Sequence, residues 1–179
     1  TKKMLERTQQ AAKIGSWQVD LKNNKCYWSS MTYKIHEEDP SKEIFVEDGI
    51  KYYSKAYIPI VRKCLEEAIS DGKDWDEELQ IKTAQGKLKW VRAIGHPVFI
   101  DNELVLLEGT FQDISARKEN EDHAENLNRR LTLALKASGV GVWEWNLITN
   151  ELIWDKQMYN LYGIKESDFE GAYMAWEKG

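Results

Sequence analysis

The chain has 179 residues, of which 42% are hydrophobic and 31% are charged, and its formal net charge is −5. This composition predicts a packed globular fold rather than a disordered chain, with length enough for one full domain and part of another. The acidic balance and the lack of a basic stripe argue against nucleic acid as a partner. No apolar run is long enough to cross a bilayer, so we expect no membrane contact within this sequence.

The predicted elements begin with a helix and a hairpin. Met4 and Leu5 start an apolar spacing that predicts an N-terminal capping helix over residues 1–13. Residues 16–21 and 25–29 alternate as two strands, and the Asn-containing stretch between them is typical of a tight turn.

Helices and a second group of strands follow. Short helical pieces are expected around residues 31–35 and after Pro40, and residues 59–71 predict the best helix, with Pro59 in its first turn and Gly72 just past its end. Alternation then predicts three strands, over residues 75–83, 88–100 and 103–114. This order predicts an α+β fold in which a five-stranded antiparallel sheet has helices on one face.

The chain also repeats itself. Residues 11–36 return as residues 137–162 without a gap, at the 126-residue spacing that separates Gly15 from Gly141. Two rare tryptophans recur in the same register, Trp17 as Trp143 and Trp28 as Trp154. A period of this length indicates a duplicated domain rather than a solenoid.

Three words of the sequence resemble the PAS/PAC sensory domain family: "GSWQVDL", "EELQIKTAQGKLKWVRAIGHPVF" and "LEGTFQDISARK". The resemblance covers residues 10–118 and begins again at residue 131. It implies the PAS fold and four segments, namely an N-terminal capping helix (1–13), a first PAS/PAC domain (14–115), a linker or signalling helix (116–138) and the N-terminal part of a second, truncated PAS domain (139–179). One departure is that residues 53–57 read "YSKAY", where related sequences often carry His-Pro-x-Asp.

No catalytic or metal site is predicted. The sequence has no Gly-rich phosphate loop, no H-E-x-x-H and no C-x-x-C. His36 aligns with Tyr162 in the repeat, which favours an aromatic position on a short helix over a ligand. Cys26 and Cys64 form neither a disulfide framework nor a zinc pattern, and they fit a reducing, cytoplasmic compartment.

The same residues argue against the cofactors that the resemblance raises. A haem-binding relative would carry a histidine on the long helix, and residues 59–71 contain none. A flavin photoreceptor would carry a reactive cysteine motif that neither Cys26 nor Cys64 matches, and Cys64 is expected to be a small apolar residue on its helix. No cofactor is evident, and any small-molecule ligand is unknown.

One candidate pocket lies between the predicted sheet and the long helix. Small residues on one face of the strand at 88–100 leave space there for an apolar ligand, or they simply let helix and sheet approach closely. The pocket residues would be Val61, Cys64, Leu79, Ile81, Val91, Ala93, Gly109 and Phe111.

The opposite face of the sheet predicts an interface. Leu88, Trp90 and Ile94 would form an exposed apolar patch, which soluble monomers usually avoid. The N-terminal helix, through Met4 and Leu5, could cover it from the same chain or from a partner. We therefore expect a homodimer.

The stretch from Gly109 to Lys118 joins the last strand to a charged helix. Ser115 is expected to cap that helix, with Asp113 beside its positive end. The helix carries a thin apolar seam, which fits either a plain spacer or a signalling helix that pairs with its twin. The seam consists of Ala124, Leu127, Leu131, Ala134 and Ser138. The family resemblance implies that Asp113, Ile114 and Ser115 form the motif through which the signal leaves the domain.

These features predict a sensory input and signal-relay module without enzyme activity of its own. Because the chain starts at Thr1, we expect it to be part of a longer protein, whose other segments could include a membrane anchor. The resemblance favours a sensor histidine kinase of a two-component phosphorelay, with its catalytic domain further along the same chain. A cyclic-dinucleotide cyclase is the alternative parent. From other classes, a small-ligand carrier or a structural dimerisation scaffold also fits the fold.

Overall fold

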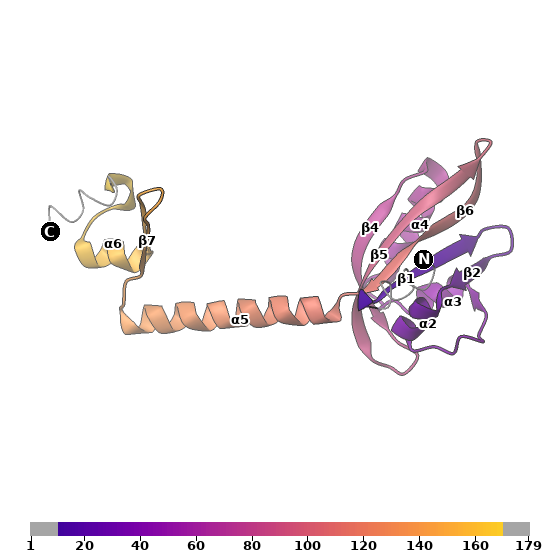
Figure 1. Ribbon diagram of the computed structural model, residues 1–179, viewed down its shortest axis with the longest axis horizontal. Helices are drawn as coiled ribbons and strands as arrows, with labels where there is room; N and C mark the ends of the chain where they lie inside the picture. The colour runs from indigo at the N-terminus through magenta and orange to yellow at the C-terminus, as the bar shows by residue number, and fades with distance from the viewer. Residues whose placement is uncertain (1–10, 170–179) are drawn as a thin grey trace. The chain divides into compact units, whose positions relative to one another are not determined.

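A curled antiparallel sheet of six strands forms the centre of the first of the two units into which the chain divides (Figure 1). The structure is a computed structural model that describes residues 11–169, and the units are residues 1–120 and 121–179. The strand order is β3-β2-β1-β6-β5-β4. The elements are β1 (Ile14–Asp20), β2 (Lys25–Trp28), α2 (Ser30–His36), β3 (Ile44–Phe45), α3 (Val46–Lys51), α4 (Ile58–Asp71), β4 (Trp75–Lys82), β5 (Leu88–Ile100) and β6 (Glu103–Asp113).

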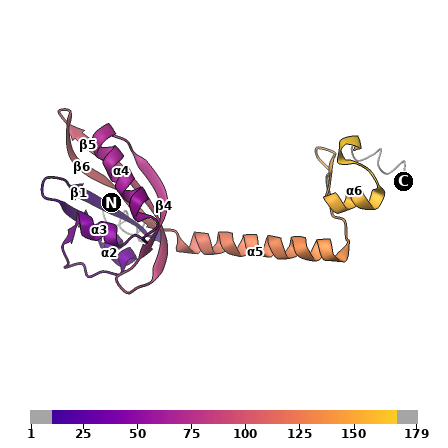
Figure 2. The ribbon, with the colours of Figure 1, turned by 180° about the vertical axis from the view of Figure 1, so that it is seen from behind.

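Helices α2, α3 and α4 lie together on one face of this sheet (Figure 2). The predicted α+β fold is therefore confirmed, with one strand more than expected. The additional strand, β3, pairs with β2 through Cys26 and Ile44, and Ile44 is completely buried. Two residues are too few to show the alternation by which strands are recognised, which is why the sequence predicted only five.

The local signals in the sequence explain the longer elements. Helix α4 has Pro59 in its first turn and is followed by Gly72, whose φ of 65° is the left-handed conformation that glycine adopts without strain. Strands β5 and β6 form a hairpin whose turn places Asp101 and Asn102 at φ 51° and 64°. Positive φ at two successive residues suits the right-handed twist of such a hairpin.

Two clusters of buried side chains fill the space between the sheet and its helices. The first contains Ile35, Ile50, Val61, Leu79, Ile81, Val91, Ala93 and Phe111. The second contains Val19, Cys26, Ile44, Ala68 and Leu107. Helix α2 reaches β1 closely because Gly15 has no side chain, and a Cβ there would lie 2.2 Å from Thr32 Oγ1.

Helix α5 (Ser115–Ser138) begins in the first unit and ends in the second, which also holds β7 (Trp143–Asn146), β8 (Glu151–Trp154), α6 (Lys156–Tyr162) and the 3₁₀ turn η1 (Glu166–Asp168). The hairpin and helix of this unit repeat the local structure of β1, β2 and α2. Trp17 pairs with Trp28 in the first sheet, and Trp143 pairs with Trp154 in the second.

The repeat extends to the helix starts and to a close approach. Asp155 caps α6 by accepting the N–H of Met158, as Ser29 accepts the N–H of Thr32 at the start of α2. A Cβ on Gly141 would lie 2.5 Å from the Met158 sulfur, which matches the contact between Gly15 and Thr32. The duplicated sequence therefore specifies the same backbone arrangement twice.

The two units differ in what covers these elements. In the first unit Val19 is buried, whereas its counterpart Trp145 is 48% exposed and Trp143 is 53% exposed. The described core of the second unit is limited to Leu152, Trp154 and Met158, with three partly buried neighbours. Its hairpin therefore lacks the packing that β4, β5 and β6 provide in the first unit.

Two expectations concern the ends of the chain. The capping helix predicted over residues 1–13, with Met4 and Leu5, lies outside the described residues except for positions 11–13. Across residues 11–169, no helix combines the length and the apolar character needed to span a membrane.

Candidate functional site

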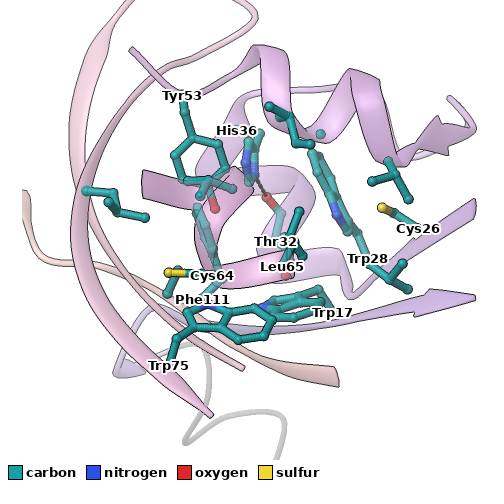
Figure 3. Close-up of a pocket in the computed structure, with 17 residues that line it drawn as sticks. Trp17, Cys26, Trp28, Thr32, His36, Tyr53, Cys64, Leu65, Trp75 and Phe111 are labelled. Atoms are coloured by element: carbon teal, nitrogen blue, oxygen red, sulfur yellow. Dashed lines mark hydrogen bonds between the residues drawn. The ribbon is translucent and has the colours of Figure 1, made fainter. Parts of the chain in front are cut away.

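A cavity of about 80 Å³ lies between the inner face of the sheet and the helices (Figure 3). Its walls come from β1, β2, α2, α3, α4, β4, β5 and β6, so every helix and strand between residues 14 and 113 except β3 contributes. The lining residues are Trp17, Val19, Cys26, Trp28, Thr32, His36, Val46, Gly49, Ile50, Tyr53, Val61, Cys64, Leu65, Trp75, Leu79, Ala93 and Phe111. None of these side chains carries a permanent charge.

The structure brings five of the eight predicted pocket residues to this cavity: Val61, Cys64, Leu79, Ala93 and Phe111. Ile81 and Val91 are completely buried in the adjoining core cluster and do not line it. Gly109 lies in the sheet opposite Gly95, where a Cβ would meet the Ile94 carbonyl oxygen at 1.8 Å. Its role is therefore close packing of β6 on β5.

Apart from Phe111, the sequence did not identify the aromatic and polar side chains of the wall. Trp17 and Trp75 stack across the curled sheet with ring centroids 5.5 Å apart, although they are 58 positions apart in the chain. Trp28 and Tyr53 were also missed. The alternation of β1 and β2 could have placed Trp17 and Trp28 on the inner face, but Tyr53 follows a short helix and carries no periodic signal.

His36 occupies the aromatic position that the repeat predicted for it. Its imidazole stacks on Trp28 and Phe111, with centroid distances of 4.1 and 4.7 Å, and Nδ1 lies 2.8 Å from the Thr32 carbonyl oxygen. A carbonyl only accepts, so Nδ1 carries the hydrogen. Burial lowers the pKa of His36 to about 4, and the ring is therefore neutral at neutral pH.

The other titratable groups of the wall are also neutral. Burial raises the pKa of Cys26 to about 11, and burial also raises the pKa of Cys64. Burial likewise raises the pKa of the Tyr53 phenol well above its usual range. Without a thiolate or a charged base, the wall offers binding rather than nucleophilic chemistry. Within residues 11–169, no group of acidic, histidine and cysteine side chains is arranged to hold a metal ion.

The second feature of functional interest is the junction between β6 and α5. Only Ile114 separates the two elements, and its N–H donates to the Trp90 carbonyl on β5 at 2.9 Å. Its own carbonyl accepts the N–H of Lys118 at 3.0 Å. The residue between the strand and the helix is therefore held by hydrogen bonds through both its N–H and its carbonyl.

The helix is capped by Asp113 and not, as the sequence had predicted, by Ser115. The Asp113 carboxylate accepts the Ser115 N–H at 3.0 Å and so caps the helix start. The Ser115 hydroxyl instead accepts the N–H of Trp90 at 3.1 Å. The serine therefore joins the helix to the neighbouring strand, and the aspartate supplies the cap.

Charged side chains tie the junction to other elements. Lys89 on β5 donates from Nζ to the Ile35 carbonyl on α2 at 3.0 Å, and the same Nζ lies 3.7 Å from the Asp113 carboxylate. On the outer face of the sheet, Glu78 on β4 pairs with Lys118 at 2.7 Å and also with Arg117. Helix α5 is thus connected to β4, to β5 and, through Lys89, to the helix that carries His36.

The predicted interface residues lie on this outer face. Leu88 is 62% exposed, whereas Trp90 and Ile94 are partly covered. The Lys118 ammonium lies 5.2 Å from the Trp90 ring centroid, and Tyr57 meets that ring edge-on at 5.8 Å. The exposed apolar area on this face is therefore smaller than the sequence suggests.

Comparisons with known proteins indicate the family to which this fold belongs. Residues 25–111 match the family model described as the PAS fold. A segment of 53 residues is 45% identical to the probable diguanylate cyclase DgcE of Escherichia coli strain K12, and it covers 30% of this chain but only 5% of that protein.

Solved structures agree at the level of the fold. A sensory box histidine kinase/response regulator from Burkholderia thailandensis E264 matches with a TM-score of 0.58 and 20% identity, over 72% of this chain and 97% of that chain. The N-terminal domain of a diguanylate cyclase with a PAS/PAC sensor from Marinobacter aquaeolei matches with a TM-score of 0.54 and 19% identity, over 59% of this chain and 98% of that chain.

The first unit is therefore a PAS domain. PAS domains are sensory modules of signalling proteins, and this chain carries such a module.

Proposed function

We propose that this chain receives a signal in the cavity of its PAS domain and relays it through α5 to a downstream output domain of the same protein. The observation that carries the proposal is the direct passage of β6 into α5. Asp113, Ile114 and Ser115 hold this passage to β5, and Lys89 links it to α2. A displacement of β5 or α2 therefore has a hydrogen-bonded path to the helix.

The output domain belongs to one of two classes. A histidine kinase of a two-component phosphorelay is the first, and the fold of the Burkholderia protein is compatible with it. A diguanylate cyclase is the second, and the 45% identity with DgcE favours it because that match is in sequence rather than in fold alone. In both cases the catalytic core is a separate domain, with this chain as its input.

The relay is proposed to work in a homodimer. No residue of α5 is buried, and two leucines of its apolar seam, Leu127 and Leu131, are 61% and 57% exposed. Pairing of two copies along this seam would cover both leucines. The seam is thin, so the pair could change its tilt or register at low cost, as a relay requires.

We further propose that residues 139–179 are the N-terminal part of a second PAS copy. The shared strand register and the shared approach of Gly141 to Met158 support this assignment. The exposed Trp143 and Trp145 then correspond to positions that the sheet and helices of a complete copy cover.

A perturbation of the cavity wall tests the relay. Ala93→Val adds two methyl groups at a position that lines the cavity and lies opposite Phe111 on β6. We expect the amides of residues 115–118 to change their hydrogen-exchange rates by at least threefold. Ala84→Val, on the exposed β4–β5 turn, is the matched control and should leave these amides unchanged. Changes confined to the cavity wall in Ala93→Val would contradict the relay.

A further inference from the structure

The cavity contains a polar group that no described part of the protein satisfies. The Tyr53 hydroxyl is directed toward the middle of the lining side chains (Figure 3). Among residues 11–169, no hydrogen bond joins this hydroxyl to another group. By contrast, Thr32 Oγ1 donates to the Ser16 carbonyl and Trp17 Nε1 donates to the Thr110 carbonyl. Tyr53 is only partly buried and no buried side-chain oxygen or nitrogen of the described residues lacks a partner, so this hydroxyl is open to the cavity space and can donate to an acceptor that enters it.

The charge of the wall limits what can arrive. No aspartate, glutamate, lysine or arginine lines the cavity, and its single histidine is already bound through Nδ1 to Thr32 and stacked on two aromatic rings. An ion entering this space would lose its hydration without gaining a countercharge. The occupant must therefore be uncharged.

The volume of the cavity limits the size of the molecule that can occupy it. An apolar cavity of about 150 Å³ is known to hold benzene, with six heavy atoms. By the same ratio, the 80 Å³ cavity of this domain holds roughly three to four heavy atoms unless its walls move. This space is far below the roughly 300–1,000 Å³ of pockets that bind drug-sized ligands or large cofactors.

We propose that the cavity binds an uncharged molecule of about four heavy atoms with an apolar body and one hydrogen-bond acceptor, such as a small ketone or aldehyde, and that the Tyr53 hydroxyl donates to the acceptor. Four aromatic rings, those of Trp17, Trp28, Trp75 and Phe111, enclose the apolar body. This inference builds on the proposed sensory role, because it names the chemical class of ligand for the same cavity.

Three probes of one shape test the proposal: acetone, isobutene and acetate. Each has four heavy atoms, but acetone is a neutral acceptor, isobutene has no acceptor and acetate is charged. Binding is measured on the whole chain by NMR titration of the tryptophan indole N–H signals, because Trp17, Trp28 and Trp75 line the site. We expect acetone to bind about fivefold more tightly than isobutene, the factor for a typical neutral hydrogen bond, and acetate to cause no saturable shift.

Tyr53→Phe supplies the matched variant, since it removes only the hydroxyl. It should weaken acetone about fivefold and leave isobutene unchanged. Equal affinity for acetone and isobutene, an unchanged acetone affinity in Tyr53→Phe, saturable acetate binding, or no binding of any probe would each overturn the proposal. None of these results depends on α5, so the relay is judged separately by the exchange response to Ala93→Val.

Discussion

The ammonium group of Lys89 links the helix that carries His36 to the start of α5, and its removal should weaken the packing of both helices on the sheet. Nζ donates to the Ile35 carbonyl at 3.0 Å and lies 3.7 Å from the Asp113 carboxylate. The Lys89 and Asp113 side chains are 19% and 12% exposed, so solvent screens this pair only in part. Lys89→Met keeps most of the aliphatic stem and removes the charge.

The expected cost follows from these contacts. A hydrogen bond from a charged donor is worth about 1.5–3 kcal/mol, and Asp113 keeps its bond to the Ser115 N–H. We therefore expect Lys89→Met to lower the free energy of unfolding by roughly 2–3 kcal/mol. The amides of residues 115–118 should exchange roughly tenfold faster, which corresponds to about 1.4 kcal/mol of local stability.

Lys87→Met is the matched control for this substitution. Lys87 pairs with Glu37 at 2.7 Å, but its side chain is 62% exposed, so the loss should be about 0–1 kcal/mol. Urea unfolding and hydrogen exchange measure both variants. If the two substitutions cost the same, or if the α5 amides do not respond to Lys89→Met, the link through Lys89 is refuted.

Three further predictions concern His36, Tyr53 and the α5 seam. The unfolded state protonates histidine near pH 6.5 and the folded state only near pH 4, so the unfolded state binds more protons between these values. The free energy of unfolding should therefore fall by about 3 kcal/mol as the pH drops from 6.5 to 4, and His36→Phe, which keeps an aromatic ring in the stack, should abolish this loss in urea titrations. Tyr53→Phe should change the free energy of unfolding by no more than about 0.5 kcal/mol, because the hydroxyl is accessible from the cavity and has no hydrogen bond to lose within the described residues, and a larger fall would contradict that reading. Leu127→Asp should dissociate the dimer in sedimentation experiments, whereas Leu133→Asp, which is off the seam and 60% exposed, should not; equal effects would exclude the seam as the interface.

The sequence predicts the regular elements well because their signals are local. Alternation marks β4, β5 and β6, and the positions of Pro59 and Gly72 mark the ends of α4. Strand β3 escapes because it is two residues long. Ser29 caps α2 and Asp155 caps α6. The two residues occupy equivalent positions of the repeat, so the cap of one copy predicts the cap of the other.

The cavity is only half predictable for a physical reason. Strand alternation places Leu79, Ala93 and Phe111 on the inner face, and the helical pattern adds Val61 and Cys64. The remaining wall depends on how the sheet curls and on how the segment between α2 and α4 folds over it. Those arrangements bring Trp75 to Trp17 and Tyr53 to the cavity, and no periodic pattern encodes them.

The junction between β6 and α5 is likewise only partly predictable from the sequence. The sequence identifies Asp113, Ile114 and Ser115 as the segment that connects strand and helix, and whether they relay a signal remains a prediction. Their bonding depends on Trp90, which is 25 positions before Ser115 in the chain and adjacent in the sheet. The same register brings Lys89 to Asp113, a pairing that spacing in the sequence does not reveal.

The relay through the junction is tested most directly by combining two substitutions. Hydrogen exchange at residues 115–118 is measured in the wild-type chain, in Ala93→Val, in Lys89→Met and in the double variant, so that the coupling between cavity wall and helix start is isolated. If Lys89 carries the connection, Ala93→Val changes these amides in the wild-type background and leaves them unchanged once Lys89 is replaced. An equal response in both backgrounds contradicts the role of Lys89, and no response in either background contradicts the relay itself.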